Sequence, residues 1–275
     1  MDSKVTIPML QQMKREGRKI VAVVAYDYQL AQIVDRAGVD IVSVGDSVGS
    51  NMWGQSNLLE VTMDQMVLAC QAVRRGVKRA LVSCDISFGP VQESTEEAVR
   101  AAVRLVKEGG ADMVKRDAAA DFPEAVRAVV RAGVPVFAQF GITPQTAQHI
   151  GGIDLAGADL AAQMKDQLVR EAKLLEESGA SLLDFTHSGP VAGPAVTQAV
   201  SIPVIGGMGG GPWLDGRVRL VQTAIGSAAT ALDNDADRYT NVARAAFDAI
   251  NAYADDVREG RQVKGGRWLP NAINE

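Results

Sequence analysis

The sequence predicts an α/β protein built as a (β/α)8 (TIM) barrel, a ring of eight parallel strands surrounded by helices. Three observations predict this fold. Short apolar runs rich in β-branched residues alternate along the chain with segments of helical periodicity. A Gly stands at the end of several helical segments, directly before the next apolar run. The length of 275 residues is close to the roughly 250 that are typical of one such barrel, so residues 1–275 are expected to form a single domain.

Seven apolar runs are short enough to be strands that are buried on both faces. They cover residues 20–24, 41–44, 80–83, 112–115, 134–138, 181–185 and 203–205. A weaker eighth run, at residues 219–222, would close the barrel. A doubly wound open sheet is the alternative fold. Against it, the first run is followed by residues 25–28, Ala-Tyr-Asp-Tyr, and not by the Gly-rich turn that such sheets use to bind dinucleotides.

Segments with helical spacing of apolar residues lie between these runs. They cover residues 29–37, 63–74, 95–108, 123–132, 160–178 and 195–200. Four of them end in a small residue and a Gly, at positions 37–38, 109–110, 132–133 and 178–179. Gly adopts the left-handed conformation that closes a helix, so these pairs mark successive joins from helix to strand. Beyond the barrel, residues 237–259 are predicted to form one long amphipathic helix, followed by a tail to residue 275.

The composition excludes several classes of protein. The 28 Lys and Arg against 33 Asp and Glu give a formal net charge of −5, and the basic residues are not clustered, so no nucleic-acid partner is expected. Every apolar run is far shorter than the roughly 20 residues of a membrane span, so no membrane partner is expected either. The charged segment 1–17 does not fit a secretory signal, which predicts a cytoplasmic protein. Cys70 and Cys84 are not spaced for metal binding and are predicted to lie in the core.

Acidic residues stand at the ends of three predicted strands. Asp46, Asp85 and Asp117 each come at or just after the end of an apolar run. Side chains at the carboxyl ends of barrel strands face one concave surface, so the three carboxylates are expected to converge. Converging carboxylates repel one another unless a cation lies between them, and Mg2+ is the ion that such oxygen ligands favour. Each Asp taken alone could instead cap the following helix.

Lys115 lies two residues before Asp117 and therefore on the same side of its strand. It could bind a substrate carboxylate, form a salt bridge with one of the acids, or act as a Schiff-base nucleophile. The glycine-rich run at residues 206–211 follows the seventh predicted strand, where barrels often bind phosphate. A tight loop, or a close approach of backbone to a ligand, explains that run equally well.

In order and content these motifs resemble those of the ketopantoate hydroxymethyltransferase family, and the similarity extends from residue 14 to residue 260. The Gly-Asp-Ser segment at 45–47 and the Gly-Ile-Thr-Pro-Gln segment at 141–145 are the most specific motifs. The other matching segments are residues 25–28, 48–49, 61–62, 73–76, 85 with 88–89, 114–115, 202–206 and 215–216.

The resemblance implies an enzyme of pantothenate biosynthesis, a homo-oligomer that is commonly a decamer. It implies Mg2+ held by Asp46 and Asp85 and, directly or through water, by Asp117. Ser47 and Lys115 would bind the carboxylate of a 2-oxo acid such as 3-methyl-2-oxobutanoate. The implied reaction is hydroxymethyl transfer, an aldol-type C–C bond formation with methylenetetrahydrofolate as co-substrate, by way of a metal-bound enolate.

The chain departs from the family at three positions. Asp117 replaces a Glu, and Gln139 replaces a His and is expected to face the substrate. Thr186 stands where the family has the Glu implied to be the general base, and Thr does not accept a proton at neutral pH. Asp184, two residues earlier on the same side of the strand, and His187, on the following loop, are the remaining candidates for that base.

Two other functions stay open on the sequence alone. A diverged paralogue could keep the metal and the enolate chemistry but carry out another aldolase or lyase reaction on a different 2-oxo acid, in specialised metabolism. A barrel without catalysis could serve as a binding or assembly subunit. The intact set of three acids and Lys115 at the strand ends favours an enzyme over a binding subunit.

Overall fold

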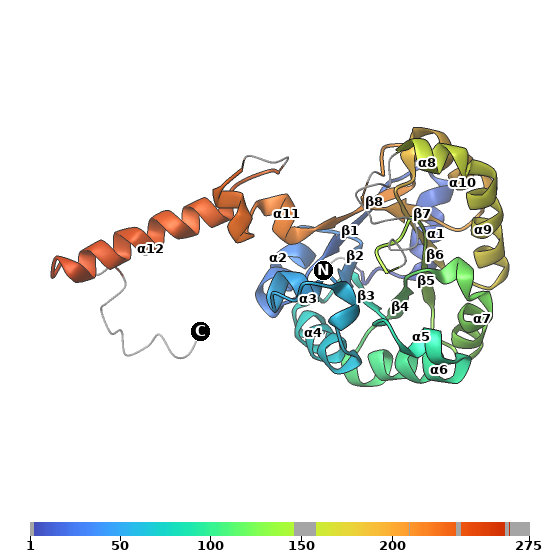
Figure 1. The fold of residues 1–275 in the computed structure, drawn as a ribbon, viewed down its shortest axis with the longest axis horizontal. Coiled ribbons are helices and arrows are strands. Elements are labelled where there is room, and N and C mark those ends of the chain that lie inside the picture. The colour runs from blue at the N-terminus through green and yellow to red at the C-terminus, as the bar shows by residue number, and fades with distance from the viewer. Residues whose placement is uncertain (1–2, 146–157, 209, 235–237, 262–263, 265–275) are drawn as a thin grey trace. The chain divides into compact units, whose positions relative to one another are not determined.

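The computed structural model describes residues 3–145, 158–208, 210–234, 238–261 and 264. The chain divides into two compact units, Met1–Val221 and Gln222–Glu275 (Figure 1). The first unit holds the barrel and the second holds the long helix near the carboxyl terminus. Among the helices of the described ranges, none is both long and apolar enough to cross a membrane.

Eight parallel strands form a closed barrel in chain order, which confirms the predicted fold and excludes the open sheet (Figure 1). The strands are β1 (Ile20–Val24), β2 (Ile41–Val44), β3 (Leu81–Asp85), β4 (Met113–Arg116), β5 (Val136–Gly141), β6 (Leu182–Thr186), β7 (Val204–Gly206) and β8 (Gly216–Leu220). Pairing of Ile20 with Gly216 joins β8 to β1. The eighth strand lies three residues before the predicted one, because Arg217 and Arg219 alternate with apolar residues and leave no continuous apolar run.

The helices follow the strands as the sequence predicts, with several shifts. Those of the barrel unit are α1 (Ile7–Arg15), α2 (Tyr28–Arg36), α3 (Val48–Met52), α4 (Met63–Gly76), α5 (Pro90–Glu93), α6 (Thr95–Arg104), α7 (Pro123–Arg131), α8 (Ala158–Gln163), α9 (Lys165–Glu177) and α10 (Gly189–Ala199). Single helical turns lie at η1 (Leu58–Glu60), η2 (Leu105–Gly109) and η3 (Ala119–Asp121). The predicted helix at 160–178 is two helices that meet at Met164. Helix α10 begins six residues before the predicted start at 195, because its Gly and Pro residues obscure the helical pattern.

The amino-terminal end of the barrel is closed by apolar packing. Leu10 and Met13 of α1, with Val5 before it, pack into one cluster with the first inward-facing residues of the strands. The strand residues in this cluster are Ile20, Ala22, Ile41, Leu81, Met113, Phe137, Leu182 and Ile205. Because this end is closed, a functional site of the barrel must lie at the opposite end.

Cys70 and Cys84 are free and buried, as predicted.

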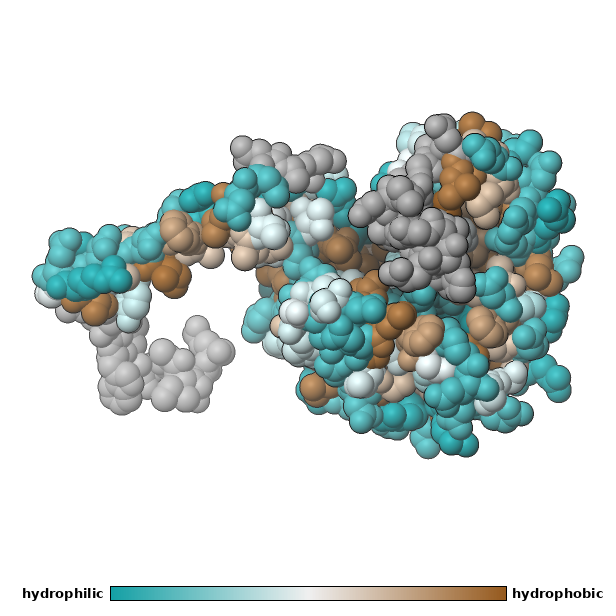
Figure 2. All heavy atoms as spheres, in the orientation of Figure 1, coloured by the Kyte–Doolittle hydropathy of each residue, from teal (hydrophilic) through white to brown (hydrophobic). Residues whose placement is uncertain are grey.

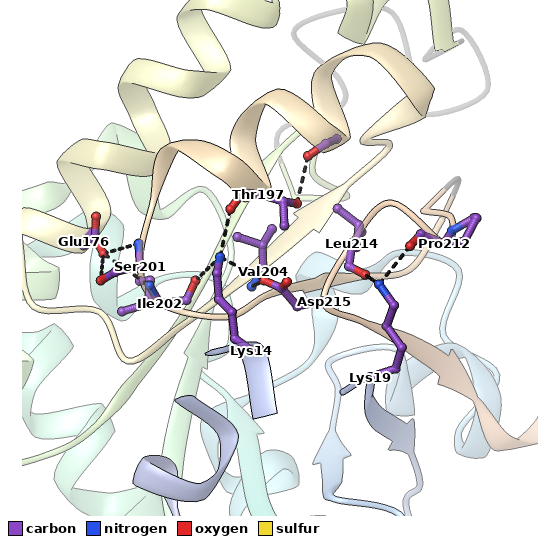
Figure 3. Close-up of polar contacts among 11 residues, drawn as sticks. Lys14, Lys19, Glu176, Thr197, Ser201, Ile202, Val204, Pro212, Leu214 and Asp215 are labelled. Atoms are coloured by element: carbon purple, nitrogen blue, oxygen red, sulfur yellow. Dashed lines mark hydrogen bonds and ion pairs between the residues drawn. The ribbon is translucent and has the colours of Figure 1, made fainter. Parts of the chain in front are cut away.

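A partly buried lysine, Lys14, links α1 to the end of the barrel that this helix covers (Figure 3). The Lys14 ammonium donates to the carbonyl oxygens of Thr197 and Ile202, each at 2.9 Å, and lies 3.0 Å from Asp215 Oδ2. Asp215 Oδ2 also accepts from the Val204 amide at 2.8 Å. These contacts join α1 to α10, β7 and the segment that leads into β8.

The second unit contains the end of α11 (Val221–Ile225), the turn η6 (Ala229–Leu232) and α12 (Val242–Arg258). The side chain of Asn241 caps α12 through the Arg244 amide and donates to the Ala231 carbonyl oxygen. Helix α12 confirms most of the predicted helix at 237–259, of which residue 237 lies outside the described ranges. Its exposed apolar residues, which include those in brown in Figure 2, are Val242, Phe247, Ile250, Tyr253 and Val257.

Candidate active site

A polar layer lies directly above the apolar layer inside the barrel. Side chains alternate between the two faces of a strand, so residues two apart point the same way. On β4, Lys115 follows the core residue Met113, and on β6, Asp184 follows the core residue Leu182. Gln139 of β5 pairs with Asp184 in the register of the two strands. All three polar residues are buried, so the interior of the barrel changes from apolar to charged within one step along each strand.

The predicted convergence of the acids is present in the structure. The Asp46 amide donates to Asp85 Oδ2 at 3.3 Å, so the ends of β2 and β3 meet at this carboxylate. The Lys115 ammonium donates to the same Asp85 oxygen at 3.1 Å and lies 3.6 Å from Asp184 Oδ2. The salt-bridge alternative for Lys115 is therefore observed, with two partners from two strands.

Gln145 connects Asp117 to this group. Its side-chain amide donates to Asp46 Oδ2 at 2.9 Å, and its backbone amide donates to Asp117 Oδ2 at 3.0 Å. Gln145 is the last residue of the motif at 141–145 and was not predicted to be a site residue. Its position could have indicated this role, because Gln145 follows the end of β5, and side chains after the strand ends face the same concave surface as the acids. We refer below to Asp46, Asp85, Asp117 and Asp184 as the acid cluster.

Burial makes ionisation of three members of the acid cluster, Asp46, Asp117 and Asp184, unfavourable. Desolvation, with repulsion from Asp85, raises the pKa of Asp46 to about 7, although Lys115 and Gln145 partly offset the shift. Desolvation also raises the pKa of Asp184 to about 6, against the opposing effect of Lys115. The pKa of Asp117 is raised by burial as well. The ammonium of Lys115 therefore offsets only part of the cost of placing these carboxylates together inside the barrel.

Lys115 remains an ammonium ion in this setting. Burial by itself would lower its pKa, but the nearby carboxylates, Asp85 first and then Asp184, raise it above the ordinary value for Lys. A lysine that keeps its proton is a poor nucleophile, because the free amine is the form that attacks a carbonyl. The arrangement disfavours the Schiff-base alternative and favours a role in binding an anion.

The donor set of the cluster fits a divalent cation with few protein ligands. Among the residues that the structure describes, one oxygen each of Asp85, Asp117 and Asp184 is buried without a hydrogen-bond partner, and such atoms normally have one. In the part of the chain that the structure describes, no three His, Cys, Asp or Glu residues are spaced to hold a metal ion together. Mg2+ commonly uses one or two carboxylates and completes its shell with water and substrate, which suits this geometry.

Ser47 stands beside the cluster at the start of α3. Its hydroxyl lies 2.7 Å from the hydroxyl of Tyr26, a fully buried residue on the loop after β1. Burial raises the pKa of Tyr26, so its hydroxyl stays protonated. The preceding Gly45 is required here, because a Cβ atom at that position would lie 2.9 Å from Ser47 Oγ. Ser47 is therefore fixed next to Asp46, with a hydroxyl that can bind an anionic ligand.

Thr186, at the position of the family's base, and His187, the other candidate for the base, make contacts with the backbone of neighbouring segments. The Thr186 hydroxyl donates to the Phe140 carbonyl oxygen at 2.9 Å, which holds β6 against β5. His187 has a left-handed backbone, with φ of 55°. Its Nδ1 lies 2.9 Å from the Ile142 carbonyl oxygen, and its amide donates to the Met208 carbonyl oxygen. Because a carbonyl oxygen only accepts, Nδ1 carries the hydrogen of this bond.

The glycine-rich run at 206–211 begins at the end of β7. A Cβ atom at position 206 would lie 2.2 Å from the Phe185 carbonyl oxygen, so close packing of β7 against β6 requires Gly206. Tight packing accounts for this first glycine without a ligand. Residue 209 lies outside the described ranges.

The closed barrel, with buried acids at the carboxyl ends of its strands, has the arrangement of a (β/α)8-barrel enzyme. The sequence profile of the ketopantoate hydroxymethyltransferase family matches residues 4–262. The chain belongs to this family, which confirms the resemblance seen in its motifs.

Named relatives agree with this assignment. The chain is 41% identical over 258 residues to the 3-methyl-2-oxobutanoate hydroxymethyltransferase of Anaeromyxobacter dehalogenans, with 92% of this chain and 83% of the relative covered. It is 39% identical over 257 residues to the enzyme of the same name from Cyanothece sp., with 92% and 96% covered.

Solved structures with low sequence identity share the fold. A 2,3-dimethylmalate lyase of the PEP mutase/isocitrate lyase superfamily superposes with a TM-score of 0.60 at 16% identity, over 98% of this chain and 93% of the other. A phosphonopyruvate hydrolase in complex with oxalate and Mg++ has a TM-score of 0.56 at 16% identity, over the same shares of the two chains. At these identities the similarity concerns the barrel fold alone.

Proposed function

We propose that this enzyme transfers a hydroxymethyl group from methylenetetrahydrofolate to 3-methyl-2-oxobutanoate or a closely related branched 2-oxo acid. The names of its relatives suggest the reaction. The observation that carries the proposal for this chain is the contact of Lys115 with both Asp85 and Asp184 inside the barrel. In this arrangement the Lys115 ammonium would bind the carboxylate of the substrate. The neighbouring acids would bind a cation and accept a proton.

Asp46 and Asp85 would hold Mg2+, with Asp117 acting through a water molecule. The oxygen of Asp85 that lacks a hydrogen-bond partner supports this assignment, as does the raised pKa of Asp46, which a cation would lower. Bound there, Mg2+ would polarise the ketone of the 2-oxo acid and make the neighbouring C–H bond more acidic. Gln145 would keep one Asp46 oxygen oriented through its hydrogen bond.

The substrate carboxylate would be bound by Lys115 and by the hydroxyl of Ser47. A buried ammonium next to an incoming carboxylate forms a charge-assisted hydrogen bond, which is stronger than a neutral one. Tyr26 keeps the Ser47 hydroxyl in place. This binding orients the substrate with its carboxylate toward β4 and β2 and its ketone toward Asp46 and Asp85.

Asp184 would take the proton from C3 of the 2-oxo acid. It lies in the polar layer of the barrel, one of its oxygens has no hydrogen-bond partner among the described residues, and its pKa of about 6 suits a general base near neutral pH. The electron pair left on C3 then forms a bond to the carbon of formaldehyde, which water releases from methylenetetrahydrofolate as tetrahydrofolate leaves. The resulting alkoxide takes up the proton from Asp184, and the hydroxymethylated acid is released.

Proton exchange tests this assignment without the co-substrate. The protein is incubated with 3-methyl-2-oxobutanoate and Mg2+ in D2O, and the C3 proton is followed by NMR. We expect exchange by the native protein, none after chelation of the metal, and a loss of at least about 100-fold in Asp184→Asn, because a general base contributes about that much or more. His187→Ala is the matched comparison and should keep its exchange rate. Normal exchange in Asp184→Asn with loss in His187→Ala would move the base to His187.

A second candidate function is a different aldolase or lyase reaction on another 2-oxo acid. It is favoured by Thr186, whose hydroxyl is engaged with the backbone of β5 and leaves its position without an acid or base. Addition of methylenetetrahydrofolate to the exchange assay separates the two. Formation of ketopantoate supports the transferase, whereas exchange without ketopantoate supports the second candidate.

A further inference from the structure

We infer that Arg116 is a positioning residue that fixes the turn after β4 and thereby aims the Asp117 carboxylate at the acid cluster. The inference rests on the proposed function for the role of Asp117, and it concerns a residue on the outer face of the barrel. Lys115 and Arg116 are adjacent on β4, so their side chains point to opposite faces of the strand. Lys115 contacts the acids inside the barrel, and Arg116 contacts the turn that follows β4.

The turn after β4 has an unusual backbone. Ala118, directly after Asp117, has φ of 49° and ψ of 38°, which is a left-handed conformation. A residue with a Cβ atom adopts this conformation only at a cost, so the surrounding structure must hold it. The direction in which Asp117 points depends on this turn, because the two residues share a peptide bond. Asp117 Oδ2 then accepts from the backbone amide of Gln145, on the segment after the neighbouring strand β5.

The Arg116 side chain contacts both ends of this turn. Its Nη1 donates to the Ala118 carbonyl oxygen at 2.9 Å, and its guanidinium carbon lies 4.7 Å from the centre of the Phe122 ring. Phe122 is the residue just before α7, so the guanidinium spans the connection from the strand to the helix. A hydrogen bond at one end and a cation–π contact at the other fix the path of the backbone between them.

The cost of burying Arg116 argues for a specific role. The residue is 3% exposed, and its Nε and Nη2 atoms have no hydrogen-bond partner among the residues that the structure describes. A buried charge with unused donors is expensive, and an apolar side chain would fill this space at lower cost. The single hydrogen bond that the guanidinium does form is directed at the strained residue, Ala118. The position of Arg116 is therefore better explained by control of the turn than by packing.

Four variants test the inference. Arg116→Met removes the charge and keeps the length of the side chain, and Arg116→Lys keeps the charge with fewer donors. Ala118→Gly, combined with Arg116→Met, relieves the left-handed strain without restoring the guanidinium. Arg127→Met, at an exposed position of α7, is the matched control. Mg2+ binding in the presence of 3-methyl-2-oxobutanoate is measured by calorimetry, and hydrogen exchange of the peptide covering residues 116–122 is measured without metal.

We expect Arg116→Met to weaken Mg2+ binding about tenfold, in the range seen when an outer support of a metal ligand is removed. The double variant should recover most of this loss, and Arg127→Met should bind as the native protein does. Hydrogen exchange of residues 116–122 should be faster in Arg116→Met alone. If Arg116→Met does not fold, Arg116→Lys is compared in its place, with a loss of at least about threefold expected.

Two results would overturn the inference. One is native Mg2+ binding together with native exchange in the Arg116 variant, and the other is a loss of binding that Ala118→Gly does not recover. Failure of the proposed function looks different, because the native protein itself would then bind no Mg2+. In that case the exchange measurement still decides whether Arg116 holds the turn.

Discussion

At the scale of single residues, the acid cluster depends on an amide as much as on its carboxylates. Gln145 donates to Asp46 from its side chain and to Asp117 from its backbone, so one residue after β5 holds acids from two other strands. An amide can do this in a buried site because it supplies donors without adding charge. The bond from the side chain engages only one of the two Asp46 oxygens, Oδ2.

We predict that Gln145→Leu weakens Mg2+ binding by about tenfold or more, because the orienting hydrogen bond to a ligand is lost while the volume is nearly kept. The apparent affinity is obtained from a Mg2+ titration of the exchange rate at C3. The matched control is Gln167→Leu, which removes an exposed Gln–Glu hydrogen bond of 2.7 Å on α9 and should leave the titration unchanged. An unchanged titration in Gln145→Leu would show that Asp46 does not need this support.

The same residues show what sequence can predict about a site. Asp46 and Asp85 are predictable because parallel strands bring their carboxyl ends to one face, whatever the details of the loops. The partners of Lys115 could not be chosen from the sequence, since each acid was an equally suitable partner. Gln145 was missed because its contact with Asp46 depends on a distance between loops that are remote in the sequence. Arg116 was missed because its contact with Ala118 depends on the left-handed backbone of the turn, which no residue pattern marks.

At the scale of elements, buried strands were predicted best. The strands β1 and β2 begin and end at the predicted residues, since each is a continuous apolar run. Strand β8 was misplaced because it is partly exposed and alternates charged with apolar residues. Helix α1 was not predicted at all. Its apolar residues cover the end of a barrel that a local pattern does not reveal.

We predict that Lys14→Met lowers the free energy of unfolding by about 3 kcal/mol, because it removes the ammonium shared by the largely shielded Asp215 carboxylate and two carbonyl oxygens. The ion pair is mostly shielded, with 13% and 14% of its two side chains exposed. Equilibrium unfolding in urea measures the change. Arg18→Met is the control: its pair with Glu16 is 65% and 41% exposed and should contribute less than about 1 kcal/mol. Equal effects of the two variants would contradict a structural role for the end of α1.

At the scale of the whole molecule, the barrel separates stability from chemistry along its axis. The amino-terminal end is apolar and closed by α1, and the carboxyl-terminal end holds four buried carboxyl groups. Apolar packing at the first end stabilises the fold, whereas ionisation of the buried acids at the second end lowers the free energy of unfolding. Assembly into a homo-oligomer stays a prediction, separate from this balance within one chain.

The raised pKa values of Asp46 and Asp184 therefore predict how the metal-free protein responds to pH. Both values, about 7 and about 6, lie above the 3.8 of an unfolded Asp, so the folded state binds more protons than the unfolded state between pH 4 and pH 7. The stability that these groups contribute is present in full below pH 4 and is lost as the pH rises through 6 and 7. Each unit of such a shift corresponds to about 1.4 kcal/mol.

We expect the unfolding temperature of the metal-free protein to fall between pH 5.5 and pH 8, and Mg2+ to restore it most at the higher pH, where the carboxylates are ionised and bind the ion. Differential scanning calorimetry at several pH values, with chelator or with Mg2+, measures both effects. Asp46→Asn should be more stable than the native protein at pH 8 without metal, because it removes a buried charge, and should gain little from Mg2+. A native unfolding temperature that rises with pH in the presence of chelator would mean that the acids are neutralised by protein groups alone, and the need for a cation at this site would disappear with that result.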